Sequence, residues 1–192
     1  MSESLNFENN SQSSENARTI KNEIFDWVQN VTFILSAIVL IFIFLVRIVG
    51  VSGSSMEPTL ADRDWLLTSN LFYEPKQGDI VILSKDTFKD GEMIVKRVIA
   101  TEHQTIDIDF DEGIVRVDGV VLDEPYIKDI TRNPINMTGP ITVPEDCVFV
   151  MGDNRNNSAD SRDSRIGTVH KSNIHGRVIL RILPFQSFGM IK

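Results

Sequence analysis

One serine in the chain stands where its hydroxyl could act as a nucleophile. Ser55 lies in the stretch of residues 53–60, between small residues and a Met-Glu-Pro-Thr sequence. Pro58 has a fixed φ and pushes Glu57, the residue before it, toward extended geometry, so helix is disfavoured. The stretch suits a backbone that leaves a strand in a sharp turn beside the serine. Such a turn can hold one hydroxyl in an accessible place. A plain loop with a capping serine is also compatible with this stretch alone.

A lysine inside an apolar segment could supply the base that such a serine needs. Lys96 and Arg97 interrupt the otherwise apolar residues 93–99. Successive side chains of a strand point to opposite faces, so one of the two cations must face an apolar neighbourhood. If it is Lys96, burial disfavours the ammonium form and lowers the pKa of the amine, which can then accept a proton. The alternative is an edge strand whose basic side chains extend into water.

A third polar stretch, residues 152–162, follows directly after the apolar residues 148–151. A loop of this composition either solvates a turn or holds a site together, and the composition alone favours neither.

A long apolar segment precedes all three stretches. Residues 27–46 carry no charge, and about 20 apolar residues span a hydrocarbon core of roughly 30 Å. A cleaved secretory signal is disfavoured, because its apolar region is shorter and starts nearer the first residue. We therefore expect a transmembrane helix over residues 27–48. The Ser-, Asn- and Glu-rich residues 1–26 predict a disordered tail.

Residues 49–192 predict an all-β domain. Short β-branched segments bounded by turn-forming residues recur through this region, and Asp118-Gly119 is typical of a two-residue hairpin turn. We expect antiparallel sheets or a partly closed barrel, attached to one N-terminal transmembrane helix. The predicted strands are residues 65–68, 79–83, 93–99, 105–110, 113–117, 120–122, 148–151 and 174–183.

The composition argues against several functions. The formal charge is −8 and there is no cluster of Lys and Arg, so nucleic acid is not an expected partner. The single cysteine, Cys147, cannot form an intrachain disulfide and is expected to be a buried strand residue. The three histidines, at positions 103, 170 and 175, lack the spacing of metal ligands. We expect neither a metal nor another cofactor.

Together, the three polar stretches resemble the successive signature boxes of the type I signal peptidases. The matching residues are 55–59, 95–99 and 152–162, in that order behind a membrane span. The resemblance covers roughly residues 27–187. Because the sequence between Lys96 and Gly152 is short, the chain is similar to the compact form of Gram-positive bacteria, which has no large inserted domain.

The resemblance implies a membrane-bound serine endopeptidase that removes N-terminal signal peptides from translocated precursor proteins. It implies that Ser55 is the nucleophile, that Lys96 is the general base, and that an acyl-enzyme forms and is hydrolysed by water. Ser158 matches the serine that hydrogen-bonds and orients the lysine amine. The other supporting residues that it implies, with an ion pair between the last two, are Asp153, Asp160 and Arg162.

The resemblance also implies where the enzyme works and what it binds. The tail is expected to be cytoplasmic and the β domain extracytoplasmic, with membrane lipid and the signal peptides of secreted precursors as partners. Substrates are expected to have small side chains at the first and third positions before the cut. The backbone N–H of Ser55 is expected to bind the oxyanion. Some relatives add a serine two residues before the nucleophile as a second donor, but this chain has Gly53 there.

Two other functions are compatible with parts of the sequence. A self-cleaving repressor also uses a Ser–Lys pair, but the apolar span and the acidic charge oppose a soluble DNA-binding protein. A membrane-tethered relative that assists binding or assembly, for example of pili, would have lost hydrolysis. The intact Ser55, Lys96 and Ser158 oppose that interpretation.

Overall fold

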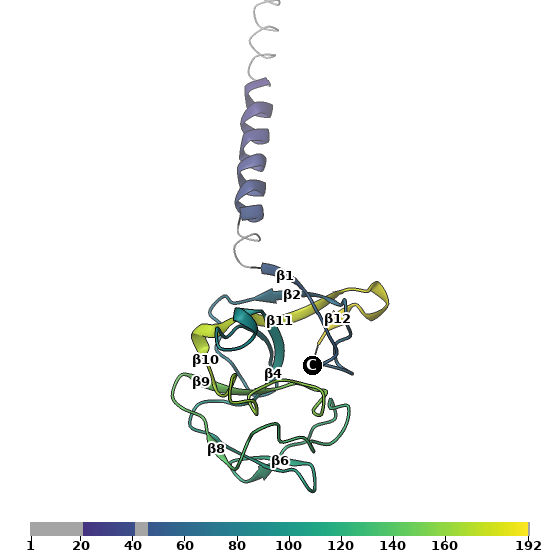
Figure 1. Ribbon diagram of the computed structural model, residues 1–192. Helices are drawn as coiled ribbons and strands as arrows, with labels where there is room; N and C mark the ends of the chain where they lie inside the picture. The colour runs from purple at the N-terminus through teal and green to yellow at the C-terminus, as the bar shows by residue number, and fades with distance from the viewer. Residues whose placement is uncertain (1–20, 41–45, 192) are drawn as a thin grey trace, which may run out of the picture. The chain divides into compact units, whose positions relative to one another are not determined.

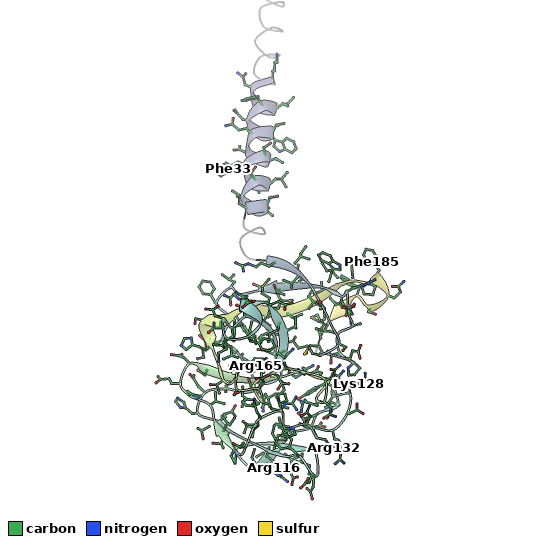
Figure 2. All side chains as sticks on the ribbon, viewed as in Figure 1. Phe33, Arg116, Lys128, Arg132, Arg165 and Phe185 are labelled. Carbon is green, nitrogen blue, oxygen red and sulfur yellow. The ribbon has the colours of Figure 1, made fainter. Side chains whose placement is uncertain are left out.

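The computed structural model describes residues 21–40 and 46–191, as two separate units. The first unit contains a helix over Lys21–Leu40, the one helix in the described part of the chain that is long and apolar enough to cross a membrane. Its apolar side chains, such as Phe33, project outward from the helix and are not covered by protein (Figure 2). A helix that exposes its apolar side chains in this way is suited to lipid.

The boundaries of this unit differ from those expected for the tail and the span. Residues 21–26, expected in the tail, belong to the helix. Residues 46–48, expected in the span, begin strand β1 (Val46–Gly50). The rest of the predicted tail, residues 1–20, and residues 41–45 of the predicted span lie outside the described residues.

The second unit contains an eight-stranded antiparallel sheet in the order β1-β2-β11-β3-β4-β9-β10, with β12 paired to β11 (Figure 1). The longest strand, β11, shifts register against both β2 and β3, and such bulges bend a strand. The other strands of this sheet are β2 (Trp65–Ser69), β3 (Ile80–Leu83), β4 (Ile94–Ala100), β9 (Cys147–Met151), β10 (Val169–His170), β11 (Ile174–Leu183) and β12 (Gly189–Met190).

A four-stranded sheet in the order β7-β6-β5-β8 completes the unit. Asp118 and Gly119 connect β6 to β7 with φ of 52° and 78°, the two positive values that a type I′ hairpin turn requires. The predicted hairpin is therefore confirmed. The strands of this sheet are β5 (Thr105–Asp109), β6 (Ile114–Val117), β7 (Val120–Val121) and β8 (Ile141–Thr142), and the described 3-10 turns are η1 (Lys89–Gly91), η2 (Lys171–Asn173) and η3 (Phe185–Ser187).

One hydrophobic cluster joins the two sheets. Ile106 and Ile108 of β5 point inward, whereas Asp107 and Asp109 alternate with them on the other face. The two isoleucines pack with Phe149 of β9 and with residues of β4. This alternation is the one expected for an antiparallel sheet with one covered face. The predicted mainly antiparallel β fold is confirmed.

The position of β4 matters most for the site. β4 pairs with β3 on one side and with β9 on the other, so it is not an edge strand. Lys96 is 3% exposed and Arg97 is 1% exposed. The edge-strand alternative for these two residues is therefore wrong, and both cations are held inside the domain.

Candidate active site

Ser55 lies on the loop that connects β1 to β2. Pairing continues past β1, because Val51 N–H donates to Asp64 O at 2.8 Å and Arg63 N–H donates to Val51 O at 2.9 Å. On the other side of the serine, the side chains of Met56 and Leu60 are buried in the core. The loop is thus anchored on both sides of Ser55.

The buried amine of Lys96 reaches this serine. Lys96 Nζ lies 2.8 Å from Ser55 Oγ and donates a second hydrogen bond of 2.8 Å to the carbonyl oxygen of Val95. Both Lys96 and Ser55 line one groove of about 320 Å³. The groove is lined by residues 49–56, which include the end of β1, and by residues 92–96.

The polar stretch 152–162 packs directly against the loop that carries Ser55. Asn154 N–H donates to Ser55 O at 3.0 Å, and its side-chain amide donates to Ser54 O at 3.1 Å. Gly152 lies so close that an added Cβ would stand 2.5 Å from Ser55 O and 2.3 Å from Ser158 Oγ. The stretch is therefore part of the site, and the alternative of a solvated turn is wrong.

Asp153 joins three segments of the site. Its carboxylate accepts hydrogen bonds from Arg97 Nε at 2.8 Å and from Arg97 Nη2 at 2.7 Å, in a pair that is almost fully buried. Thr59, on the same loop as Ser55, donates to the same carboxylate at 2.5 Å. The pair thereby fixes β4, which carries Lys96, to the loop that carries Ser55. A two-pronged arginine–carboxylate contact is well suited to this, because it fixes orientation as well as distance.

The expected ion pair between Asp160 and Arg162 is present and fully buried. Arg162 donates to Asp160 from Nε at 2.9 Å and from Nη2 at 2.8 Å. Asp160 also accepts the N–H of Gly152 at 3.1 Å. The arginine further donates to the carbonyl oxygens of Asn133 and Arg155. The pair therefore fixes residues 152–162, which contact the backbone of Ser55.

Ser158 lies at the site but does not form the hydrogen bond that the resemblance implies. Its hydroxyl is buried and has no hydrogen-bond partner in residues 21–40 and 46–191. It packs against Gly152, beside the carbonyl of Ser55. Catalytic hydrogen bonds are often incomplete before substrate binds.

The family model for signal peptidases, peptidase S26, matches residues 24–183, a range that includes all of these groups. The chain belongs to the signal peptidase family. Signal peptidase I from Bacillus amyloliquefaciens is 34% identical over 90% of this chain and 95% of its own length. Signal peptidase I T from Bacillus subtilis (strain 168) is 33% identical over 96% of this chain and 98% of its own length.

A solved structure is also similar to this signal peptidase family member. It is a signal peptidase I from Enterococcus faecalis V583, 27% identical, with a TM-score of 0.44 over 55% of this chain and 97% of that chain. The enzyme class expected from the three motifs, a type I signal peptidase and hence a serine endopeptidase, is confirmed by the family match.

Sequence reasoning missed buried residues of this site, among them Asn154 and Arg155. Arg155 makes the larger number of side-chain hydrogen bonds. Its guanidinium is fully buried and donates to Gly152 O at 3.0 Å, to Thr131 at 3.0 Å and to Glu124 at 2.6 Å. Its place within the third motif was the available signal. Its partners Glu124 and Thr131 lie outside every motif, and nothing in the local sequence indicated them.

The two tyrosines of this signal peptidase are half-buried beside carboxylates. Burial, followed by the charge of Glu124, raises the pKa of Tyr126 to about 12, and its ring stacks 3.9 Å from the guanidinium carbon of Arg97. Burial and a 2.8 Å hydrogen bond donated to Asp79 raise the pKa of Tyr73 above its ordinary value.

We expect the folded protein to show no phenolate absorbance near pH 10, where both tyrosines of the urea-unfolded chain titrate. Because the folded state keeps these protons while the unfolded state releases them, stability falls as pH rises from about 10 toward 12. Spectrophotometric titration with and without urea measures both. A phenolate signal of one tyrosine at pH 10 in the folded protein would contradict this expectation, and Tyr126→Phe would show which residue produced it.

Proposed function

We propose that this family member cleaves signal peptides from precursor proteins with Ser55 as nucleophile and Lys96 as general base. The observation that carries the proposal is the 2.8 Å contact between the amine of Lys96, a residue that is 3% exposed, and the hydroxyl of Ser55. Burial favours the neutral amine, which can accept a proton. A serine hydroxyl becomes an effective nucleophile once a neighbouring base takes that proton.

The proposed reaction has two halves. Lys96 Nζ takes the Ser55 proton while Oγ bonds to the scissile carbonyl carbon, and the carbonyl oxygen becomes an oxyanion. When the C–N bond breaks, the protonated lysine gives that proton to the leaving amine and an acyl-enzyme remains. The same amine then takes a proton from a water molecule, whose oxygen attacks the ester carbonyl. When the bond to Ser55 Oγ breaks, the amine gives that proton to Oγ, and the signal peptide and the free serine are released.

The orientation of one peptide group supports the Ser55 N–H as an oxyanion donor. The carbonyl of Ser54 accepts hydrogen bonds from Asn154 Nδ2 and from Glu57 N. The Ser54–Ser55 peptide bond is not among the cis bonds of the described chain, so its N–H points the opposite way. This N–H has no acceptor among the described residues, and it is free to bind a developing negative charge.

The groove supports an extended peptide as the substrate. Residues 49–51 and 93–95 line it along with the Ser55–Lys96 pair, and unpaired backbone beside a groove can bind a peptide in the manner of an added strand. We propose that small side chains before the scissile bond lie in this groove.

We propose a cytoplasmic tail before the Lys21–Leu40 helix, a transmembrane anchor that contains the apolar part of this helix, and an extracytoplasmic catalytic domain that begins with β1. The long apolar helix supports a single-pass anchor. The proposed partners are signal peptides and membrane lipid.

Ser158 is proposed to orient the Lys96 amine once substrate is bound. We expect Ser158→Ala to lower kcat/KM by about 10-fold, a typical loss when a group that orients another is removed. The same change removes a buried hydroxyl that has no partner, so we expect the free energy of unfolding to rise by about 1 kcal/mol. Peptide cleavage and urea unfolding measure the two effects. A gain in stability with unchanged activity would limit Ser158 to a packing role.

The function is tested with the full chain in detergent and a labelled precursor with alanine at the first and third positions before the cut. We expect one cut, directly after the alanine at the first position before the scissile bond. Replacement of that alanine with phenylalanine is expected to abolish the cut. Mass spectrometry of the products locates the cut. Binding of the precursor without cleavage would overturn the proposal and support a membrane-tethered binding module.

A further inference from the structure

The oxyanion site of the proposed reaction has one donor so far, the N–H of Ser55. Stabilisation of a tetrahedral intermediate usually uses two donors directed at one oxygen. Position 53 is a glycine and has no side chain to supply the second. A second donor must therefore come from another group that lines the groove.

Ser54 has a hydroxyl with a fixed position and a hydrogen available for donation. Its Oγ accepts a hydrogen bond of 3.1 Å from the side-chain amide of Asn157. Because the amide nitrogen is the donor, the hydroxyl keeps its own hydrogen, and a serine hydroxyl can accept and donate at the same time. Among residues 21–40 and 46–191, no group accepts that hydrogen.

Asn157 is itself held in place. Its backbone N–H donates to Asn154 O at 3.0 Å, and Asn154 is the residue that binds the carbonyl oxygens of Ser54 and Ser55. The amide that fixes the Ser54 hydroxyl therefore belongs to the same network as the backbone of the nucleophile. Ser54, Ser55, Lys96 and Asn157 all line the same groove.

The covalent geometry brings the two donors close enough to share one oxygen. Four covalent bonds join Ser54 Oγ to Ser55 N, so these atoms are at most about 5 Å apart. Two donors that each stand about 2.9 Å from one acceptor can be up to about 5.8 Å apart. The Ser54 hydroxyl and the Ser55 N–H can thus bind the same oxyanion.

We propose that the Ser54 hydroxyl is the second oxyanion donor and that Asn157 is a positioning residue that holds it. This inference rests on the proposed function, because it assigns a role in the same acyl transfer. No bond is made or broken at Ser54, which donates a hydrogen bond to the oxyanion as it forms and releases it when the C–N bond breaks.

The test compares Ser54→Ala with Ser54→Thr in the full chain. We expect Ser54→Ala to lower kcat about 100-fold with KM nearly unchanged, since a donor that acts on the transition state is lost. Ser54→Thr keeps a hydroxyl and is expected to stay within about 10-fold of the original protein. Ser164→Ala is the matched control, because Ser164 Oγ also accepts from an asparagine amide at 3.1 Å, from Asn136, and is not among the groove residues.

Inhibitor binding separates a donor from a merely structural residue. A peptide aldehyde forms a tetrahedral adduct with an oxyanion, so its affinity for Ser54→Ala is expected to fall about 100-fold along with kcat. The affinity of an uncleavable peptide with proline after the scissile bond is expected to stay the same. Equal aldehyde affinity in Ser54→Ala and the original protein would overturn the assignment.

Asn157→Ala tests the positioning role. We expect a loss smaller than that of Ser54→Ala, because the hydroxyl remains but is no longer fixed. If Asn157→Ala loses activity and Ser54→Ala does not, the asparagine amide is the donor and the proposal is wrong. If only this inference is wrong, the original protein still cleaves the precursor. If the proposed function is wrong, neither the original protein nor any variant cleaves it.

Discussion

Lys96→Met is expected to lower kcat/KM by about 10⁴- to 10⁶-fold, as the loss of a base from other serine hydrolases does. Methionine keeps the length and much of the volume of the lysine side chain but cannot accept a proton. Ser55 then keeps its place in the loop with no base at 2.8 Å. Ser55→Ala is expected to cause a loss of the same size.

The double substitution Ser55→Ala/Lys96→Met tests whether the two residues act as one unit or independently. If Ser55 and Lys96 act as one unit, the double variant is no slower than either single variant, because the second change removes nothing that still functions. Losses that multiply in the double variant would show that the two residues act separately. Cleavage of a labelled precursor in detergent measures all three.

The fold of Lys96→Met is expected to remain intact. The lysine is 3% exposed and its neighbours on β3 and β4 include Ile82 and Val95, so an apolar side chain suits the site without the cost of burying an amine. We expect the free energy of unfolding not to decrease. Lys76→Met is the control for the same chemical change outside the groove. Equal activity in Lys96→Met and Lys76→Met would overturn the assignment of the base.

The sequence predicted the participants of the site better than their contacts. The alternation of residues 93–99 showed that one cation must face an apolar region, but it could not show that both would be buried. That outcome depends on β4 having a neighbour on each side. Asp153, far along the chain, pairs with Arg97, and local patterns do not encode which charges meet.

The missed strands have a physical explanation. β8, β10 and β12 contain two residues each, which is too few for a period-two pattern to appear. β1 begins within the range predicted for the membrane span, and its Val-Arg-Ile-Val-Gly sequence continues the apolar character of that range. Apolar composition does not distinguish the end of a helix from the start of a strand. The strand is defined by its pairing with β2.

The buried polar network explains why the third motif is long. Asp153 binds Arg97, Asp160 binds Arg162, and Arg155 binds Glu124. Each buried ion is paired, as the cost of burying an isolated charge requires. Together these pairs fix the segment that contacts the backbone of Ser55, so most of the motif positions Ser55 and only Ser158 is proposed to contact Lys96.

Gly152→Ala is expected to lower kcat/KM by at least about 100-fold, because a displacement of about 1 Å at a reacting group costs this much. The new methyl group would stand 2.5 Å from Ser55 O and 2.3 Å from Ser158 Oγ, and real Cβ atoms do not approach so closely. One of the obstructing atoms is the backbone oxygen of Ser55, so the clash cannot be relieved by rotating a side chain. The contact between Ser55 Oγ and Lys96 Nζ must lengthen.

The control for Gly152→Ala is Gly139→Ala, since an added Cβ at Gly139 meets no atom within 4 Å. We expect Gly139→Ala to leave cleavage unchanged. Overpacking at Gly152 is expected to lower the free energy of unfolding by about 1–3 kcal/mol, so urea unfolding shows whether the variant is folded in the activity assay.

Gly152→Ala/Ser158→Gly removes the clash with the Ser158 side chain but not the clash with Ser55 O, and it is expected to stay inactive. Recovery of activity in that double variant would show that the clash with the Ser158 side chain, and not the clash with Ser55 O, causes the loss.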